Sequence, residues 1–369
     1  MSTCRGRGGQ AGSRIPPESV MSQSPALHQR LGIALPILQA PMAGAQGSAL
    51  AIAVARAGGL GALPCAMLSP EAMAEEFAAF RAATPAPLNV NFFCHVPPEP
   101  DPAAQARWHA ALAPFFAEFG LDIDAVPEGP GRRPFDRETC DALEPLRPEV
   151  VSFHFGLPEA ALLERVKAWG ATVLASATTV AEAEWLEARG ADAVIVQGLE
   201  AGGHRGMFLD GEVTTQVGTF ALLPQVREAI GLPLIAAGGI ADARGVAAAR
   251  ALGADGVQVG TALLCCPEAT ISAIHRRALQ SEAARHTALT NLYSGRPARG
   301  IVTRLMRELG PMAEVAPAFP LATAAIAPLR TAAEASGSGD FSPLWAGQNA
   351  SRCREVSAAE VIESLAAGL

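Results

Sequence analysis

Two stretches of the chain repeat one phrase: ARGADAVIVQG at residues 188–198 and ALGADGVQVGT at residues 251–261. In each stretch a helix-like segment ends at a glycine, and a short, almost wholly apolar run follows. Glycine accepts the left-handed conformation in which helices commonly end. The apolar run is typical of a strand that is buried on both faces. Each stretch therefore predicts the end of a helix followed by a strand of a parallel sheet.

The same phrase recurs at residues 168–176 and 229–239, so that the predicted helix-ending glycines are Gly170, Gly190, Gly231 and Gly253. The intervening helical patterns open with Thr or Asp, which favour the first turn of a helix. The front half of the chain shows the same alternation. Strands are expected near residues 38, 61, 90, 152, 173, 195, 235 and 258. Eight strand–helix units fit an α/β fold of the (β/α)8 TIM-barrel type better than a doubly wound sheet.

Three regions lie outside this pattern. Residues 1–24 are small, polar and basic, and we expect a disordered tail, with Met21 as an alternative translation start. Residues 95–149 form a long, Pro-rich insertion between the third and fourth strands, and residues 270–369 look mainly helical. We therefore predict a barrel over residues 25–269 and a smaller, mainly helical substrate domain, built from the insertion and the C-terminal region, that caps the barrel.

The composition limits the class of protein. The chain has 369 residues, 50% hydrophobic and 17% charged, which is ample for a large core and too apolar for disorder. The net charge is −8 with no long basic run, so we expect neither nucleic acid nor an anionic membrane as partner. Seven cysteines without a CxxC pair favour free thiols in a reducing cytoplasm. No apolar run approaches the roughly 20 residues of a membrane span.

In barrel enzymes the active site lies at the C-terminal ends of the strands. Here those ends carry amides, glycines and the two histidines His154 and His204. They lack a carboxylate pair, a metal-ligand cluster and a Ser/His/Asp arrangement, because Glu200 and Asp242 are single acids. We therefore expect no metal site.

The loop GLEAGGHRG at residues 198–206 surrounds His204 with four glycines. The glycines leave room for a cofactor ring or a substrate, and imidazole titrates near neutral pH, so we predict a catalytic role for His204. The alternative is a surface residue or a structural hydrogen-bond donor. His154, in SFHFG, is open between a buried core histidine and a pocket residue.

Four further residues have simpler interpretations. We interpret His95 as structural and favour aromatic packing for Tyr293. Arg296 and Arg299 either face an anion or pair with surface acids.

Two glycine motifs follow the last two strands: AAGGIAD at residues 236–242 and VGTALL at residues 259–264. Backbone N–H groups and a helix N-terminus at this place commonly bind phosphate in barrels, so the motifs indicate a phosphorylated ligand. The alternative is that the glycines serve only tight turns. No GxGxxG or P-loop lysine motif is present, which argues against a dinucleotide cradle or an ATPase.

Several linked motifs resemble those of nitronate monooxygenases, formerly called 2-nitropropane dioxygenases, and occur in the same order over roughly residues 31–350. They are LQAPMAG (38–44), NVNFFCH (89–95), VSFHFG (151–156), GLEAGGHRG (198–206), AAGGIADARGVAAARALGADGVQVGT (236–261) and FSPLWAGQ (341–348). The resemblance implies an FMN-dependent barrel that oxidises alkyl nitronates with O₂ to carbonyl compounds and nitrite. It implies small nitronates or nitroalkanes as partners, with a homodimer as one option for assembly.

The resemblance also assigns roles by position. It implies that His204 takes the α-proton of a neutral nitroalkane and that His154 lines the same pocket. The phosphate of FMN would lie on the backbone of Gly239 and of Gly260 and Thr261. The implied flavin contacts are Met42, Asn91, Gln197, Gly202, Gly239, Gln258, Val259, Gly260 and Thr261.

The chain departs from bacterial relatives in FPLATAAIAPLR at residues 319–330. Those relatives place tyrosines and a lysine in the corresponding phrase, whereas this chain has Phe319, Thr323 and Ala327. We therefore expect a more apolar pocket with fewer hydrogen-bonding groups. Three alternatives stay open: a flavin-type enoyl-acyl carrier protein reductase that uses NAD(P)H, a flavin-binding protein without turnover, and a flavin-free phosphate-binding isomerase barrel.

Overall fold

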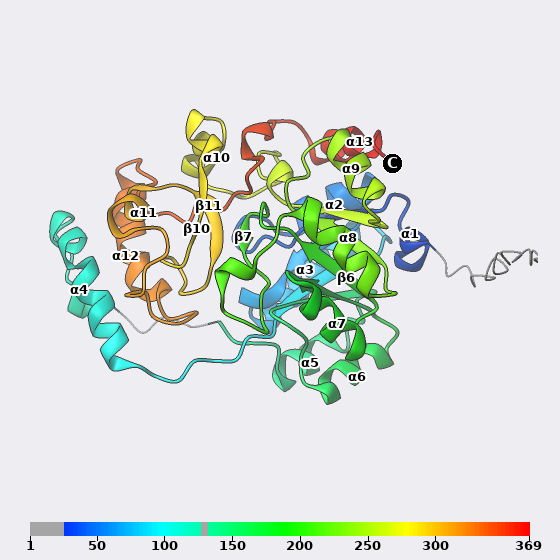
Figure 1. Cartoon of the computed structure of the whole chain (residues 1–369), viewed down its shortest axis with the longest axis horizontal. Coiled ribbons are helices and arrows are strands. Elements are labelled where there is room, and N and C mark those ends of the chain that lie inside the picture. The colour runs from blue at the N-terminus through cyan, green and yellow to red at the C-terminus, as the bar shows by residue number, and fades with distance from the viewer. Residues whose placement is uncertain (1–25, 127–131) are drawn as a thin grey trace, which may run out of the picture.

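A computed structural model describes residues 26–126 and 132–369. The predicted disordered tail, residues 1–24, lies outside the described residues. Figure 1 shows two parts side by side: a barrel of strands wrapped by helices, and a smaller part beside one end of it.

Eight parallel strands form the barrel, and each lies where the sequence predicts it. They are β1 (Ile37–Gln39), β2 (Gly61–Pro64), β3 (Leu88–Phe93), β4 (Val150–His154), β5 (Thr172–Ala177), β6 (Ala193–Gln197), β8 (Leu234–Ala237) and β9 (Gly256–Val259). The hydrogen-bonded order is β1-β9-β8-β6-β5-β4-β3-β2. A parallel bridge between Leu38 and Leu60 joins the two ends of this order. The predicted (β/α)8 architecture is confirmed.

Two glutamine side chains add hydrogen bonds to the seam of the barrel, the junction of β1 and β2, where few backbone groups pair. The Ala62 N–H donates to Gln39 Oε1 at 3.1 Å, and Gln46 Nε2 donates to the Ala62 carbonyl at 2.7 Å. Side-chain amides thus replace the missing rungs of the ladder, since a buried backbone group without a partner is costly.

We expect Gln39→Leu to lower the free energy of unfolding by about 1–3 kcal/mol, because it leaves the buried Ala62 N–H without an acceptor. The shift in the urea midpoint of the circular dichroism signal measures this. Gln225→Leu is the matched control, since the exposed Gln225 bonds only to its own helix. Equal midpoints for the two variants would contradict the role of Gln39 in the seam.

Helices cover the outer face of the barrel: α2 (Ser48–Arg56), α3 (Pro70–Ala83), α5 (Arg137–Leu143), α6 (Ala160–Ala168), α7 (Val180–Ala188), α8 (Thr219–Ala229) and α9 (Ala243–Ala251). As predicted, Thr and Asp open two of them: Thr179 accepts from the Glu182 N–H and Asp242 from the Gly245 N–H. Helix α13 (Ala358–Ala366), at the end of the predicted C-terminal region, also packs here, since Val361 and Ile362 share a core with barrel residues. Figure 1 shows α13 beside α9.

Three of the four predicted helix-ending glycines are left-handed: Gly170 (φ 92°), Gly190 (φ 91°) and Gly253 (φ 102°). The prediction for Gly231 is wrong. Helix α8 ends at Ala229, and Ile230 leaves it in extended conformation with φ −129°. The Gly231 N–H instead donates to Glu187 Oε1 at 2.8 Å, so the turn closes through a side chain on the neighbouring helix.

The interior of the barrel changes from apolar to polar along the strands. At the N-terminal end, helix α1 (Leu27–Leu31) packs into a cluster with Leu38, Leu174 and Ile235. Towards the C-terminal ends of the strands, interior positions are polar, and Asn91 Nδ2 donates to the backbone and hydroxyl oxygens of Ser152. The apolar end stabilises the barrel, and the polar end provides the groups of a site.

The smaller part is mainly helical, as predicted. It contains α4 (Pro102–Glu118) from the insertion, together with α10 (Ala273–Leu279), α11 (Arg304–Leu309) and α12 (Thr323–Ala335). Insertion and C-terminal region share one core, which includes Trp108, Phe116, Ile326 and Leu329. It also holds a feature that the sequence analysis missed, an antiparallel sheet of β10 (Thr287–Thr290), β11 (Ala298–Ile301) and β7 (Gly203–His204).

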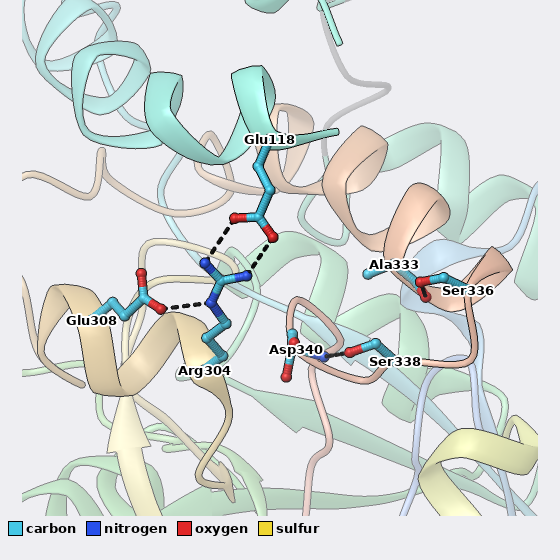
Figure 2. Close-up of polar contacts among 7 residues, drawn as sticks. All are labelled: Glu118, Arg304, Glu308, Ala333, Ser336, Ser338 and Asp340. Atoms are coloured by element: carbon cyan, nitrogen blue, oxygen red, sulfur yellow. Dashed lines mark hydrogen bonds and ion pairs between the residues drawn. The ribbon is translucent and has the colours of Figure 1, made fainter. Parts of the chain in front are cut away.

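Arg304 ties the insertion to the C-terminal region, as Figure 2 shows. Its guanidinium donates to both carboxylate oxygens of Glu118, at 2.7 and 2.8 Å, and to Glu308 at 2.6 Å. The turn after α12 is held nearby, where the Asp340 N–H donates to Ser338 Oγ at 3.1 Å. Figure 2 shows Glu118 reaching down from α4 to Arg304. The bonds of Arg304 join the insertion to the C-terminal region within the smaller part.

Across residues 26–126 and 132–369, no helix combines the length and hydropathy needed to cross a membrane. The same residues contain no group of three or more His, Cys, Asp or Glu side chains arranged to hold a metal ion. The six cysteines among them are all unpaired.

Candidate active site

A cavity of about 340 Å³ lies at the C-terminal ends of the strands and reaches to the smaller part. This volume is within the range of small-molecule sites, roughly 300–1,000 Å³. All eleven predicted site residues line it: Met42, Asn91, His154, Gln197, Gly202, His204, Gly239, Gln258, Val259, Gly260 and Thr261. The structure thus brings them together, and their individual roles stay predictions.

The backbone of His204 is held from three sides. In the small sheet His204 pairs with Ala298 of β11. Its carbonyl accepts from Gln197 Nε2 at 3.0 Å and from His154 Nε2 at 3.2 Å. Gln197 Oε1 in turn accepts from the Gly206 N–H at 2.7 Å. The side chain of Gln197, expected as a flavin contact, therefore also fixes the loop on the C-terminal side of its histidine, around Arg205.

Arg205 anchors the same loop from behind. Its side chain is completely buried and donates to the carbonyls of Gly198 and Gln197, at 2.6 and 2.8 Å, and to Gln216 at 2.9 Å. Gly206 allows the backbone to pass close to His154, because a Cβ there would lie 2.9 Å from His154 Cε1. These contacts therefore hold the loop that carries His204 in place.

Among the described residues, the imidazole of His204 has one hydrogen-bond partner. Its Nε2 lies 2.8 Å from the hydroxyl of the buried Ser294, and that hydroxyl donates to the Arg296 carbonyl at 3.4 Å. With the hydroxyl hydrogen directed to that carbonyl, Nε2 carries the proton and donates to Ser294, which leaves the lone pair on Nδ1. Burial, followed by the nearby charge of Arg132, holds the pKa of His204 well below 6.5, so the ring is uncharged at neutral pH.

Aromatic rings surround this imidazole. The rings of Phe319 and Trp345 each lie 5.5 Å from that of His204, and Phe155 and Phe93 lie 6.1 and 6.5 Å away. His204 therefore lies among aromatic rings, and the expectation that its pocket is more apolar than those of the bacterial relatives stays a prediction.

None of the three departures from the bacterial relatives is among the residues that line the cavity: Phe319 packs against His204, and Thr323 and Ala327 lie on α12. The Thr323 hydroxyl donates to the Tyr293 carbonyl at 3.0 Å.

The structure decides several open alternatives. Tyr293 packs edge-on against Trp345, with ring centroids 5.5 Å apart, as favoured. His95 is buried against Phe319, and burial lowers its pKa to about 4. The expectation that Arg296 could pair with a surface acid is wrong, because Arg296 stacks on Phe155 at 4.0 Å and donates to the Met207 carbonyl.

Arg299 does not pair with a surface acid either. It is buried and donates to the Leu199 carbonyl at 2.9 Å.

The two glycine motifs meet at one side of the cavity. Gly238 and Gly239 have φ values of 115° and 75°, which glycine adopts readily and other residues rarely do. Within the described part of the chain, the N–H groups of Gly239 and Ile240 donate to no other backbone carbonyl. Gln258, between the motifs, has a buried Oε1 without a hydrogen-bond partner in that same part. Free N–H groups beside an unsatisfied amide oxygen are what a bound polar ligand would satisfy.

The C-terminal segment 345–349 joins these motifs, and the sequence analysis assigned it no role in the site. The Gly347 N–H donates to Thr261 Oγ1 at 3.0 Å, and Asn349 Nδ2 donates to the Gly239 carbonyl at 2.9 Å. The available signal was the phrase FSPLWAGQ, which covers part of this segment. Ser294 and Arg132 were also missed, and neither stands in a recognisable motif.

Comparison with known proteins identifies relatives over nearly the whole chain. A family model described as nitronate monooxygenase matches residues 24–368. A nitronate monooxygenase of Pseudomonas aeruginosa is 43% identical, covering 91% of this chain and 96% of that protein. One from Paraburkholderia phytofirmans is 41% identical, covering 92% and 93%.

Solved structures are similar as well. A nitroalkane oxidase from Streptomyces ansochromogenes has a TM-score of 0.84 at 39% identity, covering 91% of this chain and 96% of that one. FabK from Thermotoga maritima has a TM-score of 0.66 at 26% identity, covering 91% and 93%.

Proposed function

The chain belongs to the nitronate monooxygenase family, and from this premise we propose that it binds FMN and uses O₂ to convert alkyl nitronates to carbonyl compounds and nitrite. Neutral nitroalkanes enter the reaction after His204 has removed their α-proton. The observation that carries the proposal is the uncharged imidazole of His204, held rigidly in a cavity that all predicted flavin-contact residues line.

The residues of the cavity fit a flavin mononucleotide. The free N–H groups of Gly239 and Ile240 suit a phosphate, and a single glycine cradle without a GxGxxG motif suits one phosphate group better than two. The unsatisfied Oε1 of Gln258 supplies an acceptor for a ring N–H. Gly239, Gly260 and Thr261 would hold the phosphate, and Met42, Asn91 and Gln258 the ring. When bound, the flavin supplies the electron acceptor for substrate oxidation.

His204 is suited to remove a proton from carbon. Its Nε2 is engaged with Ser294, so Nδ1 receives the α-proton of the nitroalkane, whose electron pair stays on the nitro group as a nitronate anion. The aromatic rings of Phe319 and Trp345 exclude water from this place. A preformed nitronate needs no such step, because it already carries the electron pair. The protein then has only to orient it.

Ser294→Ala is expected to lower kcat/KM for a neutral nitroalkane by roughly 2- to 13-fold, the loss of one hydrogen bond of about 0.5–1.5 kcal/mol. Without the hydroxyl, Nε2 has no fixed partner, and the tautomer with a free Nδ1 is no longer selected. Activity on the preformed nitronate should hardly change. Ser336→Ala is the matched control, since within the described part of the chain the Ser336 hydroxyl donates only to the Ala333 carbonyl, in the turn that Figure 2 shows. A loss of equal size on both substrates would contradict the role of Ser294.

The proposed function is tested on the purified protein. It should be yellow, release FMN rather than FAD on denaturation, and form nitrite from an alkyl nitronate in air. Bound FMN without nitrite formation from any nitronate or nitroalkane would support the alternative of a flavin-binding protein without turnover. Colourless protein that binds no added FMN would support the flavin-free alternative.

A further inference from the structure

We propose that Arg132, from the insertion, is the residue that recognises the anionic charge of the substrate. The inference rests on the proposed function for the identity of the substrate, and it adds a specificity-determining residue outside the sequence motifs. Arg132 lines the same cavity as His204.

The charge of Arg132 has no partner among residues 26–126 and 132–369. Its Nη1 is buried and makes no hydrogen bond within residues 26–126 and 132–369, and no carboxylate of these residues forms an ion pair with it. Arg132 is only partly buried, but its Nη1 is withdrawn from water, and a cationic group withdrawn from water is costly unless it is paired. The neighbouring Arg133 behaves in the ordinary way, since it is exposed and pairs with Glu138 at 2.7 Å.

The acids that line the cavity are already engaged. Glu200 accepts from the N–H and the hydroxyl of Thr219, each at 2.8 Å. Glu334 accepts from Arg330 and Ser342, at 2.8 and 2.7 Å. These are the two carboxylates among the described lining residues, so the lining offers Arg132 no counter-charge. An anionic ligand would provide one.

Arg132 also lies near the reacting group. Its guanidinium carbon is 5.4 Å from the centre of the Phe319 ring, and the ring of His204 is 5.5 Å from the same centre. Base and cation therefore both pack against the ring of Phe319. The charge of Arg132 lowers the pKa of His204, which agrees with this proximity. An anion beside both groups would be held by the guanidinium while its α-carbon region faces the imidazole.

The experiment compares Arg132→Met with Arg132→Lys, which keeps the charge but loses the planar fork, and with the control Arg133→Met. Calorimetric titration of the FMN-loaded enzyme with sodium nitrate measures anion binding without turnover. Arg132→Met is expected to raise the Kd about 10- to 150-fold, the range for a charge-assisted hydrogen bond. Arg132→Lys should fall between Arg132→Met and the wild type, and Arg133→Met should match the wild type.

Kinetics identify which anionic group is recognised. If the guanidinium binds the nitronate group, Arg132→Met should raise KM for every alkyl nitronate. If it binds a second anionic group of the substrate, Arg132→Met should raise KM only for a nitronate that also carries a carboxylate. In both cases KM for a neutral, uncharged nitroalkane should change least. An unchanged Kd for nitrate together with unchanged KM values in Arg132→Met would overturn the proposal. Arg132-dependent nitrate binding without nitronate turnover would instead contradict the proposed function and leave the anion site standing.

Discussion

Replacing His204 by asparagine is expected to lower kcat/KM for a neutral nitroalkane by about 10²- to 10⁴-fold, the usual contribution of a positioned general base. Asparagine keeps a polar, uncharged side chain, but its amide cannot accept a proton. The kcat/KM for a preformed nitronate should fall far less, because its α-proton has already been removed. The ratio of the two losses, measured by nitrite formation, isolates the proton-transfer step.

The pH profile of the wild type provides a second measurement of the same group. Because the pKa of His204 is held well below 6.5, the base form is present at neutral pH and is lost only as the pH falls through that lowered pKa. We expect kcat/KM for the nitroalkane to stay level as the pH falls through 6.5, where an ordinary imidazole titrates, and to decline only at more acidic pH. His109→Asn is the control for His204→Asn, because His109 lies on helix α4 and is not among the residues that line the cavity. Equal losses of His204→Asn on both substrates would contradict the assignment of the base.

Gly202→Ala is expected to weaken FMN binding. A Cβ on Gly202 would lie 2.6 Å from both Ala346 C and Gly347 N, so the new methyl group meets backbone that cannot rotate away. The loop of His204 and segment 345–349, which both line the cavity, must then move apart. Overpacking of this kind costs about 1–3 kcal/mol, which corresponds to a Kd for FMN roughly 5- to 150-fold higher if it falls on the bound state.

Flavin content after purification and fluorescence titration of the apoprotein with FMN measure this effect. Gly211→Ala is the matched control, because a Cβ at Gly211 meets no atom within 4 Å and its φ is not in the left-handed region. Wild-type affinity for FMN in Gly202→Ala would show that the contact between the loop and segment 345–349 is not needed for the cofactor site.

The barrel was predictable because its strands are buried on both faces and therefore consist of short apolar runs, such as AVIVQ at residues 193–197. The hairpin of Thr287–Thr290 and Ala298–Ile301 was not, because these four-residue strands show no clear alternation. The second strand also pairs with the distant Gly203 and His204, which no local pattern indicates. The position of α13 on the barrel likewise depends on tertiary contacts.

Some residues of the candidate site were likewise predictable from the sequence, and others were not. Glycine motifs and strand ends identify the lining, since a barrel brings all strand ends together. Arg132 and Arg133 show the limit: they are identical neighbours in the sequence, yet one is partly buried at the cavity and the other is exposed and paired with Glu138. Ser294 is a similar case, because its role follows from its distance to His204 across 90 residues of chain. No local pattern carries such information.

The most direct measurement is anaerobic mixing of the FMN-loaded enzyme with propionate 3-nitronate while the flavin absorbance is followed. The account predicts loss of the oxidised flavin spectrum, its return when air is admitted, and formation of nitrite. NADH under the same conditions should leave the spectrum unchanged. Bleaching by NADH with no response to the nitronate would contradict the account and support an NAD(P)H-dependent reductase.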